Sequence, residues 1–247
     1  MDIALILIAA FAAGVLNTIA GGGTFLTFPA LVFIGVPPVL ANATSTVAAL
    51  PGYLAGAVGF RAELAQMERA VVLRLVVITL VGGVLGAILL LVSSNEAFSV
   101  IVPFLLLAAT LVFMFGDRLR AWAASKSRAV TPYGTAAMLM VSIYGGYFNG
   151  GLGIVLLALF ALWGMVNIHE MNGLKTALSF ALAAISMLVY AAGGLVVWHH
   201  ALAMMLAATA GGYAGAPLSR ALPKPVVRGL VAAVGFGMSA IFFWRIL

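Results

Sequence analysis

Two glycine clusters are the parts of this sequence best suited to bind a ligand. The first is Gly21, Gly22 and Gly23, and the second is Gly150, Gly151 and Gly153. Consecutive glycines disfavour a continuous helix, so each cluster predicts a break followed by a new helix. The backbone N–H groups and the positive dipole end at such a helix start favour an anion. The alternative is that the glycines only allow helices to pack closely in a membrane.

Polar side chains that can bind an oxyanion lie on both sides of the glycine clusters. They are Asn17, Thr24, Asn149, the group Asn42, Thr44, Ser45 and Thr46, and the group Asn172, Lys175 and Thr176. Their hydroxyl, amide and ammonium groups can replace the hydration shell of an anion. Two alternatives stay open: the asparagines Asn42 and Asn172 can cap the helices they open. Lys175 can face a polar cavity or extend to the cytoplasmic interface.

Histidine and acidic residues give fewer indications of chemistry. His169 and Glu170 either form a proton-coupling pair, because histidine titrates near neutral pH, or lie in a solvated loop. His199 and His200 lack further ligands, and the sequence has no cysteine, so we expect no metal and no other cofactor. The H-E-x-x-H, P-loop and G-x-S-x-G motifs are absent from the sequence. We therefore expect no enzymatic activity, and transport that is driven by a gradient.

The composition defines the class of protein in which these groups act. Of the 247 residues, 65% are hydrophobic and 7% are charged, whereas an average soluble domain is about 45–50% apolar and about 25% charged. A soluble fold of this size cannot bury so much apolar surface, and the continuous apolar runs differ from the alternation of a membrane β-barrel. We therefore expect an all-α polytopic membrane protein. Its excess of basic residues, 12 against 6 acidic ones, indicates membrane topology and no nucleic-acid partner.

Ten apolar segments divide the chain into two similar halves. The first repeat, residues 1–116, contains Ile3–Ala20, Thr24–Ile34, Val39–Phe60, Ala70–Val92 and Phe98–Phe115. The second repeat, residues 133–247, contains Gly134–Asn149, Ile154–Val166, Asn172–Leu195, Ala201–Pro217 and Val226–Trp244. The polar residues 117–132 form the expected linker. The second segment of each half is shorter than the roughly 20 residues of a full crossing, so it is either broken or re-entrant, and about eight to ten hydrophobic segments result.

Matching residues support an internal repeat. Gly21, Gly23, Asn42 and Thr46 each find the same residue type 130 positions later in the chain. The spacing Gly82-Gly83-x-x-Gly86 also recurs at Gly211-Gly212-x-x-Gly215. Short, glycine-interrupted segments at matching places in two halves are the best sequence indication of a transporter site.

The basic residues orient the two repeats. Eleven of the 12 Lys and Arg residues lie in or beside four regions: 61–74, 118–128, Lys175 and 220–228. The positive-inside rule makes these regions cytoplasmic, so the linker is cytoplasmic and both termini are periplasmic. Equivalent loops of the two halves then lie on opposite sides of the membrane. The halves are therefore expected to be inverted-topology repeats.

Two stretches resemble the signature motifs of the TauE/SafE-like sulfite exporter family. The first is AGGGTFLTFPALVFIGVPPVLANATSTVA, residues 20–48, with its glycine break, Pro29 and Leu31, and Ala41 through Thr44 and Ser45. The second is GGYFNGGLGIVLLALFALWG, residues 145–164, together with Asn172–Thr176. The resemblance covers nearly the whole chain.

This resemblance implies a multi-pass transporter of the bacterial inner membrane. Its expected substrates are small sulfur-containing or organic anions, such as sulfite, sulfonates and sulfoacetate-like compounds. We expect alternating access, with the two glycine breaks meeting near the membrane centre, with or without proton coupling, and with lipids as the other partner. The alternatives are a channel for small anions, or a non-catalytic membrane scaffold.

Overall fold

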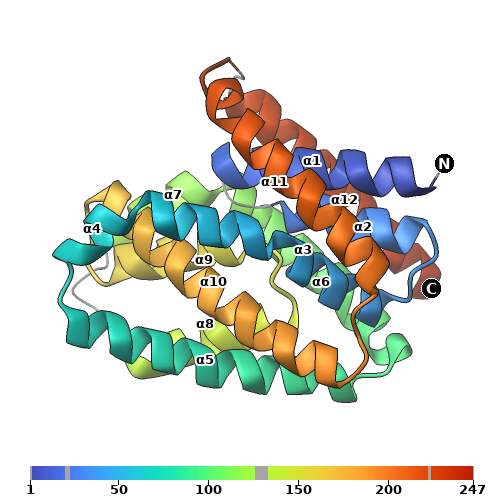
Figure 1. Ribbon diagram of the computed structural model, residues 1–247, viewed down its shortest axis with the longest axis horizontal. Coiled ribbons are helices and arrows are strands. Elements are labelled where there is room, and N and C mark those ends of the chain that lie inside the picture. Colours follow the sequence, from blue (N-terminus) through green and yellow to red (C-terminus); the bar gives the residue numbers. More distant parts are fainter. Residues whose placement is uncertain (1, 20–22, 126–132, 222–223, 247) are drawn as a thin grey trace.

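The computed structural model describes residues 2–19, 23–125, 133–221 and 224–246 (Figure 1). Within these ranges the chain forms twelve α-helices and no strand. The helices are α1 (Asp2–Ile19), α2 (Thr24–Phe33), α3 (Pro38–Gly59), α4 (Arg61–Gln66), α5 (Arg69–Val92), α6 (Asn95–Met114), α7 (Gly116–Ser125), α8 (Thr135–Tyr147), α9 (Leu152–Leu162), α10 (Ile168–Ala192), α11 (Trp198–Ala221) and α12 (Lys224–Ile246). The all-α prediction is confirmed for the described residues.

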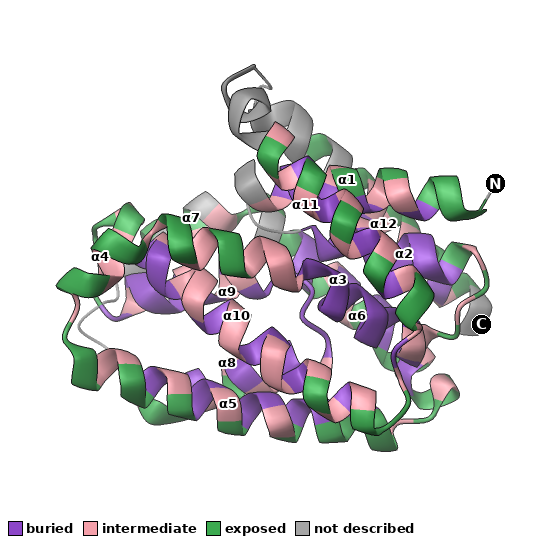
Figure 2. Cartoon of the chain, in the orientation of Figure 1, coloured by how far each residue is buried: buried purple, intermediate pink, exposed green. Residues whose placement is uncertain are grey.

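Among the described residues, three helices are long and apolar enough to cross a membrane, which supports a multi-pass membrane protein. They are α5, residues 95–112 of α6, and α10. The 24 residues of α5 extend over about 36 Å, more than the roughly 30 Å of a hydrocarbon core. Leu73, Val77, Val81 and Leu85 form an exposed apolar stripe at helical spacing along this helix. Figure 2 shows the exposed outer face of α5 against a buried inner side.

Helices α2 and α9, which the sequence predicts to be short, are too short to cross a membrane. Helix α2 has 10 residues and α9 has 11. Both end in the same way, with a glycine of positive φ at Gly35 (88°) and Gly164 (87°). The next amide then closes the turn, because Val36 N–H donates to the Leu31 carbonyl and Met165 N–H donates to the Phe160 carbonyl, both at 3.0 Å. Such Schellman turns satisfy the last carbonyls of each helix.

Four pairs of helices form the main packing contacts. Helix α1 packs on α11, α5 on α8, α3 on α10, and α6 on α12, as Figure 1 shows for α5 and α8 along one edge. Glycines make the first two pairs close. A Cβ at Gly14 would clash with the Ala208 carbonyl, and one at Gly86 would clash with the Ile143 carbonyl. The glycine spacing seen twice in the sequence therefore lies where two helix backbones touch.

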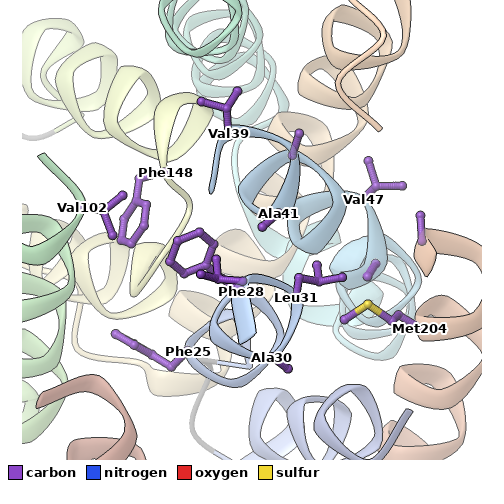
Figure 3. Close-up of a cluster of buried hydrophobic side chains, with 14 of the residues drawn as sticks. Phe25, Phe28, Ala30, Leu31, Val39, Ala41, Val47, Val102, Phe148 and Met204 are labelled. Atoms are coloured by element: carbon purple, nitrogen blue, oxygen red, sulfur yellow. The ribbon is translucent and has the colours of Figure 1, made fainter. Parts of the chain in front are cut away.

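The buried hydrophobic residues form two clusters. One contains residues of α1, α2, α3, α5, α6, α9, α10, α11 and α12, and its Phe28 and Phe148 rings lie side by side in Figure 3. The other contains residues of α5, α8, α9 and α10, such as Leu75, Leu156 and Leu178. Helix α9 contributes to both clusters, with Ile154 in the first and Leu156 in the second, whereas α2 belongs to the first. Most side chains of α2 and α9 are buried.

The interpretation of Asn42 and Asn172 as helix caps is wrong. Each is the fifth residue of its helix, because α3 begins at Pro38 and α10 begins at Ile168. Proline fits a helix start, since its fixed φ is helical and the N–H it lacks has no partner there. The cap of α10 is Asn167, whose side chain accepts a 3.0 Å hydrogen bond from the His169 N–H.

Two segments predicted to be irregular are helical. His169 and Glu170 belong to the first turn of α10 and not to a loop. The Glu170 carboxylate accepts a 2.8 Å hydrogen bond from the Asn167 side chain, which fixes this turn. The first part of the polar linker forms α7, which packs against α9. Residues 126–132 of the linker lie outside the described residues.

Candidate site at the helix breaks

The second break is a tight turn between α8 and α9. Asn149 (φ 59°) and Gly151 (φ 70°) both have left-handed backbones, which asparagine and glycine tolerate better than other residues. Gly151 is the N-cap of α9, so the first N–H groups of that helix point into the turn. The chain therefore opens a helix N-terminus inside the protein, as the glycine cluster predicts.

Two tyrosine hydroxyls fix the backbone around this break. Tyr144 donates to the Gly150 carbonyl and Tyr190 donates to the Gly146 carbonyl. Gly145 and Gly146 allow α8 to approach its neighbours, since a Cβ at Gly146 would meet the Gly83 backbone of α5. The break is thus held by α5, α8 and α10 together.

The Asn149 side chain is the most unusual group of the site. It is 1% exposed, and neither its Oδ1 nor its Nδ2 has a hydrogen-bond partner that meets normal geometry. The Tyr53 hydroxyl of α3 interacts with the same Asn149 amide. A buried amide without such a partner costs about 1–3 kcal/mol, so this pair of polar groups is suited to a polar solute that satisfies it.

Lys175 lies beside the first turn of α9. Its Nζ donates a 2.9 Å hydrogen bond to Asn172 Oδ1, one turn earlier in α10. A Cβ at Gly153 would stand 3.3 Å from Lys175 Cδ, so the side chain runs along the bare glycine. Within the part of the chain that the structure describes, this neutral amide is the one hydrogen-bond partner of the Lys175 ammonium.

At the first break, hydrogen bonds join the described residues on either side of it. The Gly23 N–H donates to Asn17 Oδ1 at 2.8 Å. Four residues later, the hydroxyls of Thr27 and Ser45 share a 2.5 Å hydrogen bond that joins α2 to α3. Thr24 opens α2 and is 7% exposed. Gly21 and Gly22 lie outside the described residues.

The two breaks lie next to each other. A Cβ at Gly151 would be 3.5 Å from the Phe25 ring in the first turn of α2. The Phe28 and Phe148 rings pack edge to face with centroids 5.9 Å apart, as Figure 3 shows. The Asn42 amide of α3 donates to the Tyr147 carbonyl at 2.8 Å. Residues far apart in the sequence thus bring the starts of α2 and α9 together.

Three predicted hydroxyls have partners that do not belong to the break turns. Thr44 Oγ1 accepts a 3.1 Å hydrogen bond from the Val197 N–H, ahead of α11. Thr46 and Thr176 each donate to a carbonyl of their own helix, to that of Asn42 at 3.0 Å and to that of Asn172 at 2.9 Å. Because a hydroxyl has one proton, Thr46 and Thr176 as oriented here have none to donate to an anion.

The sequence analysis missed Tyr53, Tyr144 and Tyr190. All three lie in apolar helices, where a tyrosine looks like an ordinary packing residue. Tyr190 reaches a carbonyl 44 residues away along the chain. No spacing rule could have linked Tyr190 to the break, because that contact depends on how α8 packs against α10.

Comparison with known proteins identifies relatives over the full length. The chain matches a probable membrane transporter protein of Haemophilus influenzae with 28% identity over 97% of this chain and 96% of the relative. It matches a second, named ORF9, of Sinorhizobium with 27% identity over 96% and 90%. A third, YfcA of Escherichia coli K12, is 26% identical over 94% and 86%.

Solved structures and family models give two further results. No solved structure matches this chain significantly. The model of the family described as sulfite exporter TauE/SafE matches residues 6–242, which include both breaks, all of α2 to α11 and most of α12. Together with relatives named as membrane transporters, the match agrees with the resemblance in the glycine motifs. The chain belongs to the sulfite exporter TauE/SafE family.

Proposed function

We propose that this chain is a secondary active transporter that moves small sulfur-containing or organic anions by alternating access. The observation that carries the proposal is Lys175, an ammonium bound to a neutral amide beside a helix N-terminus. A cation at such a place in a membrane protein is costly unless it faces a partner or a polar path. A bound anion supplies that partner.

The groups around α9 match the chemistry of a sulfite or sulfonate. These anions have three oxygens that accept hydrogen bonds. Lys175 Nζ, Asn149 Nδ2 and the Tyr53 hydroxyl are donors that can serve them, next to the positive dipole end of α9. The family description names a sulfite exporter, and sulfoacetate-like organic anions share the same charged group.

The first break contributes the opposite wall of the proposed site. Gly23 and Thr24 start α2, whose Phe25 contacts Gly151. The remaining residues of the proposed site are Asn17, Gly21, Gly22, Asn42, Thr44, Ser45, Thr46, Gly150, Gly153, Asn172 and Thr176. Some of these side chains hold the breaks in shape and do not touch the anion.

Inverted repeats are part of the proposal, and the helix pairs support them. If α1, α2, α3, α5 and α6 correspond to α8, α9, α10, α11 and α12, each contact should occur twice or join equivalent helices. The pair α1–α11 then corresponds to α8–α5, and α3–α11 corresponds to α10–α5. The pairs α3–α10 and α6–α12 join equivalents. The matching Schellman turns after α2 and α9 give the same correspondence.

We place this arrangement in a bacterial inner membrane with residues 117–132 in the cytoplasm and both termini in the periplasm. The basic residues of α4, α5 and α7 then share the cytoplasmic side, in accord with the positive-inside rule. In this proposal the closely packed pairs α1–α11 and α5–α8 move as two rigid bodies, which their glycine contacts support. Their rocking about the short helices would expose the site to each side in turn.

Uptake of labelled sulfite and taurine-like sulfonates into proteoliposomes tests the proposal. We expect saturable uptake that an imposed gradient accelerates and that unlabelled sulfonate inhibits. Uptake equal to that of empty liposomes for every sulfur anion would contradict the substrate class. Single-channel currents in a planar bilayer would instead favour the anion channel.

A further inference from the structure

A second region of the molecule combines a cation with an apolar groove. The groove has a volume of about 440 Å³ and is lined by Ala70, Leu73, Arg74, Val77, Ile78 and Thr135. The groove is shallow and open, so it can cover one side of a ligand and not enclose it. It lies between α5 and α8, on the side of the molecule away from α11 and α12 (Figure 1).

Arg74 has no charged partner in the described part of the chain. Its guanidinium donates a 2.6 Å hydrogen bond to the Thr135 hydroxyl at the start of α8. A neutral hydroxyl leaves the positive charge and the remaining N–H donors of the guanidinium available. Thr135 can also donate its own proton to the same anion. The head of the groove therefore complements a phosphate.

The depth of Arg74 fits the boundary between headgroups and acyl chains. It lies five residues after the first residue of α5, which corresponds to about 7.5 Å along the helix. The headgroup layer on each side of a bilayer is about 5–7 Å thick. Below Arg74 the groove continues along Val77 and Ile78, which carry no polar group.

We propose that this groove binds one anionic phospholipid. The phosphate lies on Arg74 and Thr135, and one acyl chain follows Leu73, Val77 and Ile78. Two observations favour a lipid over a soluble phosphate: the walls of the groove are apolar, and Leu73 and Val77 are 65% and 51% exposed on a helix that is long enough to cross the membrane. The site joins α5 to α8, so a bound lipid stabilises that helix pair.

Native mass spectrometry of the detergent-purified protein with phosphatidylglycerol or phosphatidylcholine tests the proposal. We expect the wild-type protein to retain phosphatidylglycerol at least fivefold more than phosphatidylcholine. Arg74→Gln should remove this preference, and Thr135→Ala should halve it. Arg69→Gln is the matched control, because Arg69 is an exposed cation of the same helix outside the groove, and it should keep the preference.

Two further measurements distinguish a bound lipid from a bound soluble phosphate. Val77→Trp fills the groove and should lower the retention of both lipids, whereas millimolar glycerol 3-phosphate should displace neither. Equal phosphatidylglycerol retention by Arg74→Gln and the wild-type protein would overturn the proposal. Full displacement by glycerol 3-phosphate would also overturn it, since the occupant would be a soluble phosphate. If Arg74→Gln elutes as an aggregate, Arg74→Lys replaces it. Arg74→Lys keeps the positive charge and should retain the lipid.

Discussion

The two helix breaks have similar sequences, but their polar groups differ in hydrogen bonding and in charge. At the first break, the Asn17 amide oxygen accepts from the Gly23 N–H, and Ser45 is paired with Thr27. At the second break, the Asn149 amide has no partner of normal geometry, and the position that matches Ser45 is Lys175. The described polar groups at the first break are therefore paired with one another, while the second break presents a cation and an amide.

The substitution with the largest expected effect tests whether anion transport depends on the positive charge at the second break. Lys175→Gln removes the ammonium and keeps a side chain of similar length next to Gly153. Loss of a charged hydrogen bond of about 1.5–3 kcal/mol should weaken anion transport by roughly 100-fold. Proteoliposome uptake measures this, with Arg61→Gln as the exposed control. If Lys175→Gln transports at the wild-type rate, the charge of Lys175 does not distinguish the function of the second break from that of the first.

The matching glycines Gly23 and Gly153 should respond differently to added side chains. A Cβ at Gly23 clashes with the Ala13 carbonyl, so Gly23→Ala should destabilise the fold by about 1–3 kcal/mol. A Cβ at Gly153 meets only the flexible Lys175 stem, so Gly153→Val should leave the fold intact and raise the KM for the anion roughly tenfold.

Fluorescence-detected gel filtration after heating measures the stability of both variants, and uptake measures KM. The reverse result, with Gly153→Val unfolding first and Gly23→Ala raising only KM, would contradict the assignment of roles to the two breaks.

Substitutions at Asn149 test the role of its side-chain amide while the left-handed backbone of the second break is kept. Asn149→Gly accepts the left-handed backbone without strain and deletes the amide, so it should lower the affinity for the anion roughly fivefold while the thermal stability stays the same or rises. Asn149→Asp keeps the shape and adds a negative charge, and it should abolish transport. Isothermal titration with sulfite measures the affinity of both variants, and proteoliposome uptake measures their transport. If Asn149→Asp binds sulfite as tightly as the wild-type protein, the amide does not face the anion.

The smallest expected effect is at the first break. Ser45→Ala removes the hydrogen bond with Thr27, whose hydroxyl still lies 3.5 Å from the Gly23 carbonyl. The loss of about 1 kcal/mol should lower the Tm by roughly 2–4 °C. Uptake should stay within twofold of the wild-type rate. A Ser45→Ala variant with full stability and impaired uptake would show that the hydroxyl serves the solute.

The sequence predicts the parts of the fold that depend on local properties. Apolar runs define the helices because each buried residue adds its own transfer free energy. Glycine clusters define the breaks because backbone freedom is a property of single residues. The pattern predicts short helices at Thr24–Ile34 and Ile154–Val166, and they are observed at Thr24–Phe33 and Leu152–Leu162. The start of α3 at Pro38 is one residue from the predicted Val39, whereas the start of α10 at Ile168 was missed because its first turn lies outside the hydrophobic pattern.

Only the tertiary structure determines which partners each polar side chain has. Sequence alone names Asn17, Asn149 and Lys175 as equal candidates, since amide and ammonium groups carry the same chemistry wherever they stand. Packing then gives Asn17 a backbone partner, leaves Asn149 against Tyr53, and lays Lys175 along Gly153. A hydrogen bond depends on distances between helices that are far apart in the chain, and those distances exist only after the helices have packed.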